Sequence, residues 1–538
     1  MFKQVVVLSG RVCSGKTTLA ELLKERFGTI IFRTRDHFQK LDPKTEFARD
    51  KMQKLGERLD KKTQGRWVCD GLTKFDMTEN NSDNNIVIVD AIRIRNQVIA
   101  IRKSYKDKVV HIHLNAPLSE LVQRYKKKKK RKGIKELKSY RLVQLDPTEA
   151  KVKKLEDIAD VVIDTKRCTK QDVTVKAASH LGLYGRGSVR LVDVLVGGQY
   201  GSEGKGNISS YLAREYDILV RVGGPNAGHK VYAEPKPHTF HHLPSGCLSA
   251  PVAKILIGPG ATIYPPDFLD EINRFEINYK RVSVDPQVMI ISKKDKNDER
   301  RLVSTIGSTG QGVGAANARR IRHRQPGKVK LAKDCRDLRL FIRDTCEVLE
   351  KAFQKQQKVF LEGTQGTGLS LYHGHYPHVT SRDTTVAGCL AEAGISPSRT
   401  RKIIIVCRTY PIRVESPKGG TSGPMSREIT WQEVEKRSRY GRGILTRNER
   451  TSTTNRLRRV GEFEWTWLRK ACSLNAPTDI ALTFVDYISK QNDKARRFER
   501  LDEKTLRFIE EIERVAAAPV SLISTGFEYR NIIDRRAW

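Results

Sequence analysis

The chain has 538 residues, which predicts two to four domains, each long enough to bury its own core. Hydrophobic residues make up 38% and charged residues 30%, and no apolar run approaches the roughly 18 to 20 residues of a membrane span. The 100 Lys and Arg residues exceed the 62 Asp and Glu residues, and the net charge of +38 predicts contact with polyanions, either nucleotides or non-specifically bound nucleic acid. Nine scattered cysteines without a CxxC pair indicate reduced thiols rather than disulfides or zinc. The chain also starts without the layout of a secretory signal, so we expect a cytoplasmic protein.

A phosphate-binding loop follows the first predicted strand. Residues 5–23 read VVVLSGRVCSGKTTLAELL, in which a strand, a GxxxxGK[ST] pattern and a helix come in the required order. In such a loop the bare amides cradle phosphate oxygens, Lys16 reaches the β and γ phosphates, and the Thr17 hydroxyl ligates Mg²⁺. The residues of this predicted loop are Gly10, Ser14, Gly15, Lys16, Thr17 and Thr18.

The next predicted strands end in acidic and basic residues. FRTRDHFQKL carries Arg33, Arg35 and Asp36, and IVIVDAIR carries Asp90 and Arg93. Ligands of α/β proteins bind outside the carboxyl ends of parallel strands, so these side chains are candidates for an acceptor site. The alternative is that they are ordinary surface or fold residues.

With these motifs, the first half resembles the nucleoside monophosphate kinase and dephospho-CoA kinase group. The resemblance implies an arginine-bearing lid with Arg124 and Arg131 as candidates, and it places Asp164 near the base of ATP. The basic run of residues 124–138 is open to three interpretations: a nucleic-acid patch, a lid over phosphates, or a solvated helix face. The acceptor of this kinase is not indicated.

A second strand and glycine loop, LVDVLVGGQYGSEGKGN, begins at Leu191. The glycine-rich stretch before it reads as a linker, which predicts a kinase-like domain at 1–180, a linker at 181–190 and a second domain at 191–538. In both halves, short apolar runs alternate with helical stretches. We therefore predict an α/β protein whose first domain is a P-loop kinase-like parallel sheet covered by helices.

Seven motifs in order show that the second half resembles adenylosuccinate synthetase. They are GGQYGSEGKGN, RVGGPNAGH, IGSTGQGVG, EGTQGTGLSLYHGHYPHVTSRDTT, TTNRLRRVGEF, LTFVD and STG, between residues 197 and 526. The resemblance implies a second domain with the α/β fold of that family. It also implies that a nucleoside triphosphate phosphorylates the 6-oxygen of a purine nucleotide, after which the amine of L-aspartate displaces the phosphate. Positioned cations and hydrogen-bond donors carry most of such catalysis.

The resemblance also implies roles for individual residues. Catalytic candidates are Ser202, Lys205, His229 and Gln365, and the carbonyl of Gly228 is the candidate ligand of Mg²⁺. Candidates for binding the triphosphate, which is ATP or GTP, are Gly201, Glu203, Gly204, Gly206, Phe484, Asp486, Ser524 and Gly526. Candidates for the acceptor nucleotide are Asn226, Ser308, Thr309, Arg319, Arg320 and Thr380. Candidates for L-aspartate are Thr453, Arg456 and Arg458.

Ser202 departs from the family pattern, which has an aspartate that takes the N1 proton of the hypoxanthine ring. A serine hydroxyl is a poor general base near neutral pH. Because the rest of the pattern is intact, we expect a changed substrate rather than a lost activity. A smaller, neutral side chain leaves room for the 2-amino group of guanine, and the same substitution resembles the phage-type 2-aminoadenylosuccinate synthetases. The predicted acceptor is thus GMP or dGMP, with IMP or dIMP as the alternative.

Three further expectations stay open. Phe484 replaces a lysine of the family's LTKLD motif, and a ring that stacks on any purine favours ATP over GTP. In the family an arginine of a neighbouring subunit completes the phosphate site, so Arg319, Arg320 or Arg322 implies a homodimer. The alternative from another class is a nucleic-acid-bound kinase or sensor with an inactive synthetase half.

Overall fold

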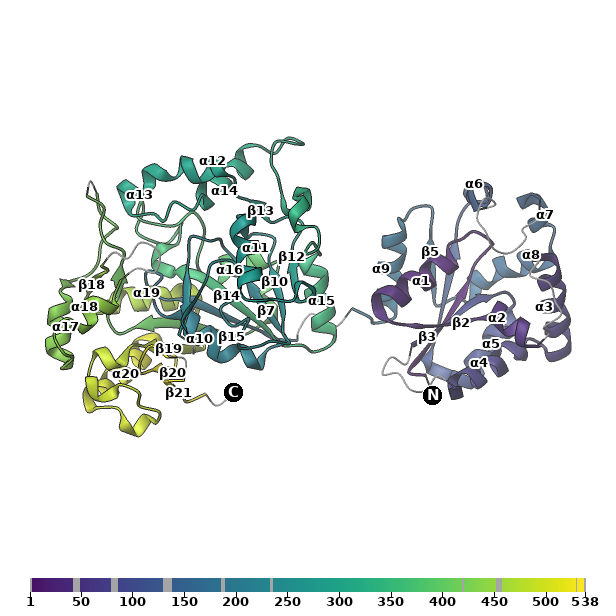
Figure 1. The fold of residues 1–538 in the computed structure, drawn as a ribbon. Helices are drawn as coiled ribbons and strands as arrows, with labels where there is room; N and C mark the ends of the chain where they lie inside the picture. The colour runs from purple at the N-terminus through teal and green to yellow at the C-terminus, as the bar shows by residue number, and fades with distance from the viewer. Residues whose placement is uncertain are drawn as a thin grey trace. The chain divides into compact units, whose positions relative to one another are not determined.

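The computed structural model describes residues 2–41, 49–78, 86–128, 138–184, 189–232, 236–418, 420–450, 457–528 and 530–536. The chain divides into two compact units, Met1–Gly185 and Arg186–Trp538 (Figure 1). Each unit is built around a twisted sheet with helices on its faces, so the α/β prediction is confirmed for both halves. Among the described residues, no helix is long and apolar enough to cross a membrane.

The first unit contains a five-stranded parallel sheet in the order β2-β3-β1-β4-β5. Its strands are β1 (Gln4–Ser9), β2 (Ile30–Arg33), β3 (Ile86–Ile92), β4 (Val109–Asn115) and β5 (Val161–Asp164). Its helices are α1 (Lys16–Phe27), α2 (Thr34–Leu41), α3 (Arg49–Thr63), α4 (Arg66–Thr78), α5 (Arg95–Tyr105), α6 (Leu118–Lys128), α7 (Tyr140–Gln144), α8 (Pro147–Lys153) and α9 (Lys170–His180).

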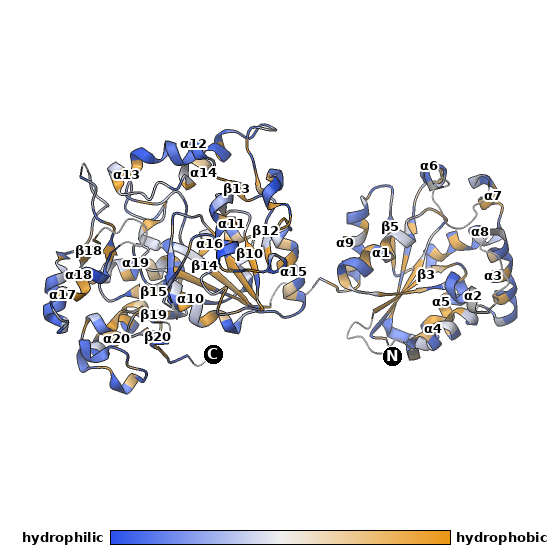
Figure 2. Ribbon diagram, viewed as in Figure 1, coloured by the Kyte–Doolittle hydropathy of each residue, from blue (hydrophilic) through white to orange (hydrophobic). Residues whose placement is uncertain are grey.

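Alternating residues of the central strands explain why this sheet is covered on both faces. Val5 and Val7 of β1 pack into one hydrophobic cluster, whereas Val6 and Leu8 pack into another. Side chains of a strand alternate between its faces, so a continuous apolar run is buried on both sides. Figure 2 shows this pattern as hydrophobic central strands beneath helices whose outer surfaces are hydrophilic.

The second unit contains a nine-stranded sheet in the order β12-β10-β7-β14-β6-β15-β19-β20-β21. Its pairs are parallel except the last, β20 with β21. In that order the strands are Val282–Val284, Lys254–Ile257, Ile218–Arg221, Val359–Gly366, Val192–Gly197, Thr400–Arg408, Asp479–Thr483, Val520–Ser524 and Ile532–Asp534. Three small sheets pair β8 (His229–Val231) with β9 (His238–Phe240), β11 (Thr262–Ile263) with β13 (Met289–Ile290), and β18 (Arg459–Gly461) with β16 (Ile412–Arg413) and β17 (Glu428–Ile429).

Helices cover both faces of this larger sheet, and the apolar clusters on its two sides include different residues of the same strands, such as Val194 and Leu195. The helices are α10 (Lys205–Leu212), α11 (Pro265–Arg274), α12 (Lys293–Asp298), α13 (Arg300–Ile306), α14 (Val313–Arg322), α15 (Thr345–Gln354), α16 (Val386–Ala393), α17 (Trp431–Ser438), α18 (Ile444–Asn448), α19 (Trp465–Asn475) and α20 (Glu503–Ala516). The loops after β6, β7, β14, β15, β19 and β20 all leave the same edge of the sheet, because these strands are parallel. Part of the candidate site lies on or beside these loops, including Ser202, Glu203 and Phe484, whereas Gln365 lies in β14 and Arg319 and Arg320 lie on α14.

Candidate active site

The loop after β6 is organised around the carboxylate of Glu203, which is 1% exposed. This carboxylate accepts hydrogen bonds from the backbone N–H groups of Gln199 (3.0 Å) and Gly201 (2.8 Å). Its other oxygen pairs with Lys205 Nζ at 2.6 Å, and Nζ also donates to the Gly201 carbonyl at 3.0 Å. The Glu203 carboxylate therefore holds the backbone of the loop in place, and the buried Lys205 ammonium group lies next to it.

The loop ends at the N-terminus of α10, where Gly204 has φ +85° and no side chain caps the first turn. Gly206 in that turn has no room for a side chain, since a Cβ atom would lie 2.7 Å from the Lys230 carbonyl oxygen. Uncapped amides at a helix N-terminus, next to a lysine, suit a phosphate group. The local geometry thus fits the phosphate-binding role predicted for this loop.

His229 lies at the start of β8 and is oriented by Glu362 of β14. Its Nδ1 is 2.5 Å from a Glu362 oxygen, and Arg221 pairs with the same carboxylate at 2.7 Å. Ser245 also donates to it through its backbone N–H at 2.7 Å. Burial, together with the nearby Arg221 charge, lowers the pKa of His229 to about 3, although Glu362 opposes the shift. The imidazole is therefore neutral, and its Nε2 is a buried atom without a hydrogen-bond partner.

The acceptor candidates Asn226 and Thr380 meet the catalytic candidate Gln365, although the three are far apart in the sequence. The side-chain amides of Asn226 and Gln365 both donate to the Thr380 hydroxyl, at 3.2 and 2.9 Å. Asn226 Oδ1 is buried without a hydrogen-bond partner, and Gln365 has the left-handed φ of +61°. The unmet oxygen of Asn226, next to the strained backbone of Gln365, indicates a polar ligand site.

The other acceptor candidates are more dispersed. Thr309 is exposed, and the Ser308 hydroxyl accepts the Gly310 N–H at 3.2 Å. Arg319 makes two hydrogen bonds to Asp295, at 3.0 and 2.7 Å, which attach α14 to α12. Arg320 donates to the Gln287 carbonyl at 2.9 Å. Within one chain Arg319 and Arg320 thus brace α14, whereas Arg322 at the end of the helix is exposed.

The predicted base site of the triphosphate is lined by aromatic rings. Phe484 has φ +60° and is 9% exposed, with the Arg408 guanidinium 4.3 Å from its centroid and the Phe527 ring at 5.5 Å. One Asp486 oxygen accepts the Tyr440 hydroxyl at 2.5 Å, and the other is buried without a hydrogen-bond partner. Burial raises the pKa of Asp486 to about 6. Phe484 has little exposed surface in this state, so a purine that stacks on it must displace a neighbour.

A buried ionic cluster adjoins the segment that is predicted to bind aspartate. Glu449 is 1% exposed and accepts hydrogen bonds from Arg408 (2.8 Å), Arg458 (3.0 Å) and the Tyr487 hydroxyl (2.6 Å). Arg408 also donates to the Ser202 carbonyl at 3.2 Å. Thr453 and Arg456 lie outside the described residues, whereas Arg458 is held by Glu449. A single buried pair thus connects the Ser202 loop, the base site and the aspartate segment.

In the first unit, the predicted phosphate loop has glycines where the backbone takes a positive φ. Gly10 and Gly15 have φ of +139° and +109°, and Gly15 caps α1 without any side-chain contribution. Lys16 Nζ donates to the carbonyls of Gly10 (2.6 Å) and Arg11 (3.0 Å). The Thr17 and Thr18 side chains are exposed, while Ser14 Oγ is buried without a hydrogen-bond partner. The loop therefore presents bare amides and an available Thr17 hydroxyl.

Asp90 lies at the end of β3, close to this loop. One of its oxygens is buried without a hydrogen-bond partner, and burial raises its pKa against the opposing charges of Lys16 and nearby arginines. Arg93 pairs with Glu149 at 3.2 Å, while Asp36 is exposed on α2. Asp90 is thus a predicted acceptor-site residue with an unmet polar atom, and Arg33 is another, since its Nε is also buried without a hydrogen-bond partner.

The predicted lid is described only in part. Arg124 of α6 donates to the hydroxyl and the carbonyl of Thr165, both at 2.9 Å, directly after β5. This places it beside Asp164, which was predicted to lie near the base of ATP. Arg131 lies outside the described residues.

Comparison with known proteins identifies the second unit. The family described as adenylosuccinate synthetase matches residues 194–334 and 327–493, more than half of the chain. The chain belongs to the adenylosuccinate synthetase family. An AAA domain matches residues 6–144, so this synthetase carries an N-terminal P-loop, kinase-like domain.

The relatives and solved structures agree with this assignment. The adenylosuccinate synthetase of Methanocaldococcus jannaschii is 39% identical over 351 residues, which cover 64% of this chain and 96% of the relative. That of Pyrococcus horikoshii is 37% identical and covers 64% and 98%. The structure of a cyanophage S-2L succinoaminodeoxyadenylate synthetase, bound to dGMP and to dATP as an energy donor, covers 65% of this chain and 96% of its own, with TM-score 0.54 and 26% identity. The fully ligated Plasmodium falciparum adenylosuccinate synthetase matches in fold, with TM-score 0.54, 21% identity and coverage of 64% and 100%.

Family membership assigns aspartate ligation on a purine nucleotide to the second unit, and it implies a nucleoside triphosphate and Mg²⁺. The residues present fit both groups. The uncapped amides of α10 and the buried Lys205 suit a triphosphate, and the family position of the Gly228 carbonyl supplies a hard oxygen of the kind Mg²⁺ prefers. In the first unit, Thr17 and Asp90 offer the same class of ligand.

Several residues of the site were missed from the sequence alone. Glu362 stands in the EGTQG motif, but nothing in the sequence shows that it orients His229, 133 positions away. Arg408 and Glu449 lie outside the seven motifs, and Phe527 directly follows the STG motif. A buried charge is rarely retained without a partner of opposite charge. Acidic and basic residues close to the known motifs were therefore the sequence feature that could have pointed to these buried pairs.

Proposed function

We propose that the second unit joins L-aspartate to C6 of a guanylate, GMP or dGMP, and that the first unit is a nucleotide kinase. The observation that carries the choice of acceptor is Ser202. In this family the position belongs to an aspartate that removes the N1 proton, and here the loop around it is otherwise complete. Glu203, Lys205 and Gly204 keep the phosphate-binding geometry described above, which argues against a decayed site.

The reaction proceeds in two steps. The γ-phosphoryl group passes to O6 of the purine, and the amine of aspartate then attacks C6, so that the C6–O bond breaks and phosphate leaves. Lys205 and the α10 amides hold the donor phosphates, and Mg²⁺, when bound, neutralises the charge that develops there. Asn226, Gln365 and Thr380 hold the acceptor.

His229 acts where the charge develops at O6. In the free protein its Nδ1–H donates to Glu362, and Nε2 carries a lone pair directed away from that carboxylate. A phosphoryl group beside Nε2 favours the protonated imidazole, because opposite charges at short range stabilise each other. The protonated ring then donates to O6 or to the transferring group, while Glu362 fixes its orientation.

Ser202 adapts the site to guanine by size and charge. Its backbone carbonyl is held by Arg408, and its side chain is partly exposed, so the residue reaches the site without the bulk or charge of a carboxylate. Guanine differs from hypoxanthine by one amino group at C2. The structure of the cyanophage synthetase contains dGMP, which supports the same acceptor here.

The second candidate acceptor is IMP or dIMP, the ordinary substrate of the family. Overall similarity favours it, because the curated relatives at 35–39% identity are named adenylosuccinate synthetases. With either acceptor, a group other than the Ser202 side chain must take the N1 proton when O6 is phosphorylated, because guanine and hypoxanthine both carry that proton; a water molecule or a phosphate oxygen can accept it. For the donor we propose ATP, since Phe484 provides an aromatic surface without preference for guanine.

One experiment separates the two acceptors. The purified protein is incubated with Mg²⁺, L-aspartate and either ATP or GTP, and IMP, dIMP, GMP and dGMP are offered separately. We expect a succinyl adduct of GMP or dGMP by mass spectrometry. An adduct of IMP or dIMP alone would return the protein to ordinary adenylosuccinate synthesis, and no adduct from any acceptor would favour the nucleic-acid-bound alternative.

A further inference from the structure

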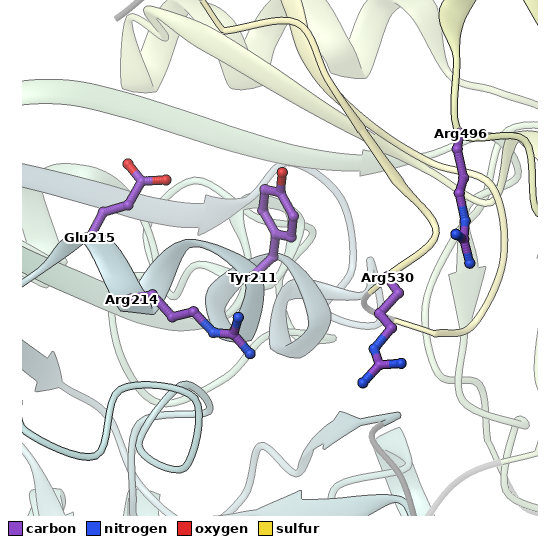
Figure 3. A pocket seen from close by; sticks show the side chains of 5 residues that line it. All are labelled: Tyr211, Arg214, Glu215, Arg496 and Arg530. Carbon is purple, nitrogen blue, oxygen red and sulfur yellow. The ribbon is translucent and has the colours of Figure 1, made fainter.

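A basic pocket lies on the second unit, and none of its lining residues belongs to the predicted substrate sites. It is lined by Tyr211, Arg214, Glu215, Arg496 and Arg530 and has a volume of about 490 Å³. Tyr211 comes from α10, and Arg214 and Glu215 from the turn after it, whereas Arg496 and Arg530 come from two C-terminal loops (Figure 3). Three guanidinium groups from three separate segments therefore surround one hollow.

The acidic and phenolic groups of the pocket already have partners. Glu215 accepts two hydrogen bonds from Arg536, at 3.0 and 2.6 Å, and the Tyr211 hydroxyl donates to Asp534 at 3.0 Å. Three of the five lining residues are arginines and one is a glutamate, so basic side chains predominate in the lining.

The walls of the pocket are tied to one another by hydrogen bonds. Asn207 of α10 donates to the Phe527 carbonyl at 2.5 Å, and the N–H of Lys494 donates to the Thr525 carbonyl at 3.0 Å. These contacts link the helix, the segment that carries Arg496 and the loop that carries Arg530. A tied framework reduces the entropy lost when a ligand is bound.

We propose that this pocket binds a small ligand with at least two phosphate charges, such as pyrophosphate or the phosphate chain of a nucleotide. Guanidinium groups form paired hydrogen bonds with phosphate oxygens, and three of them suit an anion with many oxygens. The volume is within the usual range of small-molecule sites. None of the lining residues belongs to either glycine loop, and the inference does not depend on which purine the synthetase accepts.

The pocket is also connected to the predicted donor site. Arg530 lies on the loop that starts after Ser524, and Phe527 of the same loop contacts Phe484. A phosphate ligand that contacts Arg530 would change the affinity for the donor, because the two sites share one segment. Occupancy of the pocket is therefore expected to lower the KM for the triphosphate.

Pyrophosphate binding to the full chain tests the proposal by titration calorimetry at about 0.15 M salt. The variant Lys16→Ala/Lys205→Ala weakens the binding of phosphate groups at the two glycine loops. The pyrophosphate binding that remains in this variant therefore comes from other sites. We expect about one remaining site per chain, weakened about tenfold or more by adding Arg496→Gln/Arg530→Gln. The matched control, Arg507→Gln/Arg514→Gln on the exposed face of α20, should leave it unchanged.

Two further measurements keep the result interpretable. Arg496→Lys/Arg530→Lys keeps the charge but loses the forked donors, so an intermediate affinity is expected, and thermal unfolding verifies that each variant is folded. Absence of the remaining site, or the same affinity in the Gln variant and its control, would overturn the proposal. Tight binding of a single-stranded oligonucleotide that depends on these arginines and is not displaced by pyrophosphate would do so as well, because the ligand would then be nucleic acid.

Discussion

At the scale of single residues, the proposed reaction depends on Ser202 and His229. Ser202 stands where the family has a carboxylate, and burial keeps His229 neutral while Glu362 orients its ring. In the proposal above, Ser202 selects the purine that is accepted, and His229 assists the transfer of the phosphoryl group.

Replacement of Ser202 by aspartate is expected to reverse the acceptor preference. The carboxylate would supply a base for the N1 proton that both purines carry, but it would crowd the 2-amino group that only guanine carries. We expect the ratio of kcat/KM for IMP over GMP to rise by about tenfold or more, because only GMP has a group that the larger side chain displaces. Competition assays with both nucleotides measure the ratio, and Ser202→Ala is the matched control. An unchanged ratio in Ser202→Asp would show that Ser202 does not select the acceptor.

Replacement of Glu362 by glutamine tests the orientation of His229. An amide keeps the size but loses the charge that holds Nδ1–H and supports the protonated ring, so kcat is expected to fall by about 10²-fold while KM changes little. Steady-state kinetics across pH measure the effect. The pH profile of kcat should also shift to lower pH, because the imidazolium loses its anionic partner. A fall in kcat with no shift of the profile would indicate that Glu362 only maintains the fold.

At the scale of elements, two arrangements connect segments that are distant in sequence. The Arg408–Glu449 pair links the loops after β6, β15 and β19 to the segment before Arg458. In the first unit, Ser9 of β1 lies 2.7 Å from His111 and 2.8 Å from His113, both on β4. Both clusters are buried. The stability of each unit should therefore fall when a charge is removed from the Arg408–Glu449 cluster or when a strand histidine becomes charged.

Removal of Glu449 should destabilise the second unit. Glu449→Ala leaves the buried guanidinium of Arg408 without its anion, which costs about 3–5 kcal/mol. Urea unfolding followed by tryptophan fluorescence measures the change. The control Glu433→Ala breaks the exposed pair with Arg437, where about 1 kcal/mol or less is expected. Equal losses in the two variants would mean that the Arg408–Glu449 cluster has no special role.

Acid should destabilise the first unit through its strand histidines. Burial lowers the pKa of His111 and of His113 from 6.5 to about 4. The unfolded chain therefore binds more protons between pH 6.5 and 4, and their contribution to stability is complete above pH 6.5 and lost as the pH falls. Thermal unfolding from pH 7 to 4 should show this loss, and His111→Asn/His113→Asn should make the dependence shallower. An unchanged slope would show that other groups dominate.

At the scale of the whole molecule, the chain joins two α/β units, each with its own sheet and its own phosphate-binding glycine loop. Each glycine loop is placed by a strand of its own sheet, β1 or β6, and leads into its own helix. The two reactions should therefore be separable. The net charge of +38 attracts anions in general but does not specify a ligand.

Inactivation of one loop is expected to leave the other reaction intact. Lys16→Ala should lower the rate of phosphoryl transfer by the first unit, and Lys205→Ala should lower the rate of aspartate ligation. A fall of about 10²-fold or more is expected in each case, because each variant removes a cation from a phosphate site. Nucleotide phosphorylation and adduct formation are measured for both variants. Loss of both activities in either single variant would show that the units depend on each other.

The sequence by itself determined the α/β class of both units, the two glycine loops and the family of the second, because these depend on local patterns of apolar residues and glycines. Only the tertiary structure brought Asn226, Gln365 and Thr380 together and paired Glu362 with His229, since those contacts depend on strand order in a parallel sheet. The contact of Arg319 with Asp295, 24 positions away, is a further example, because a charge pattern does not reveal which acid an arginine meets. The role of Arg319 in the nucleotide site stays a prediction.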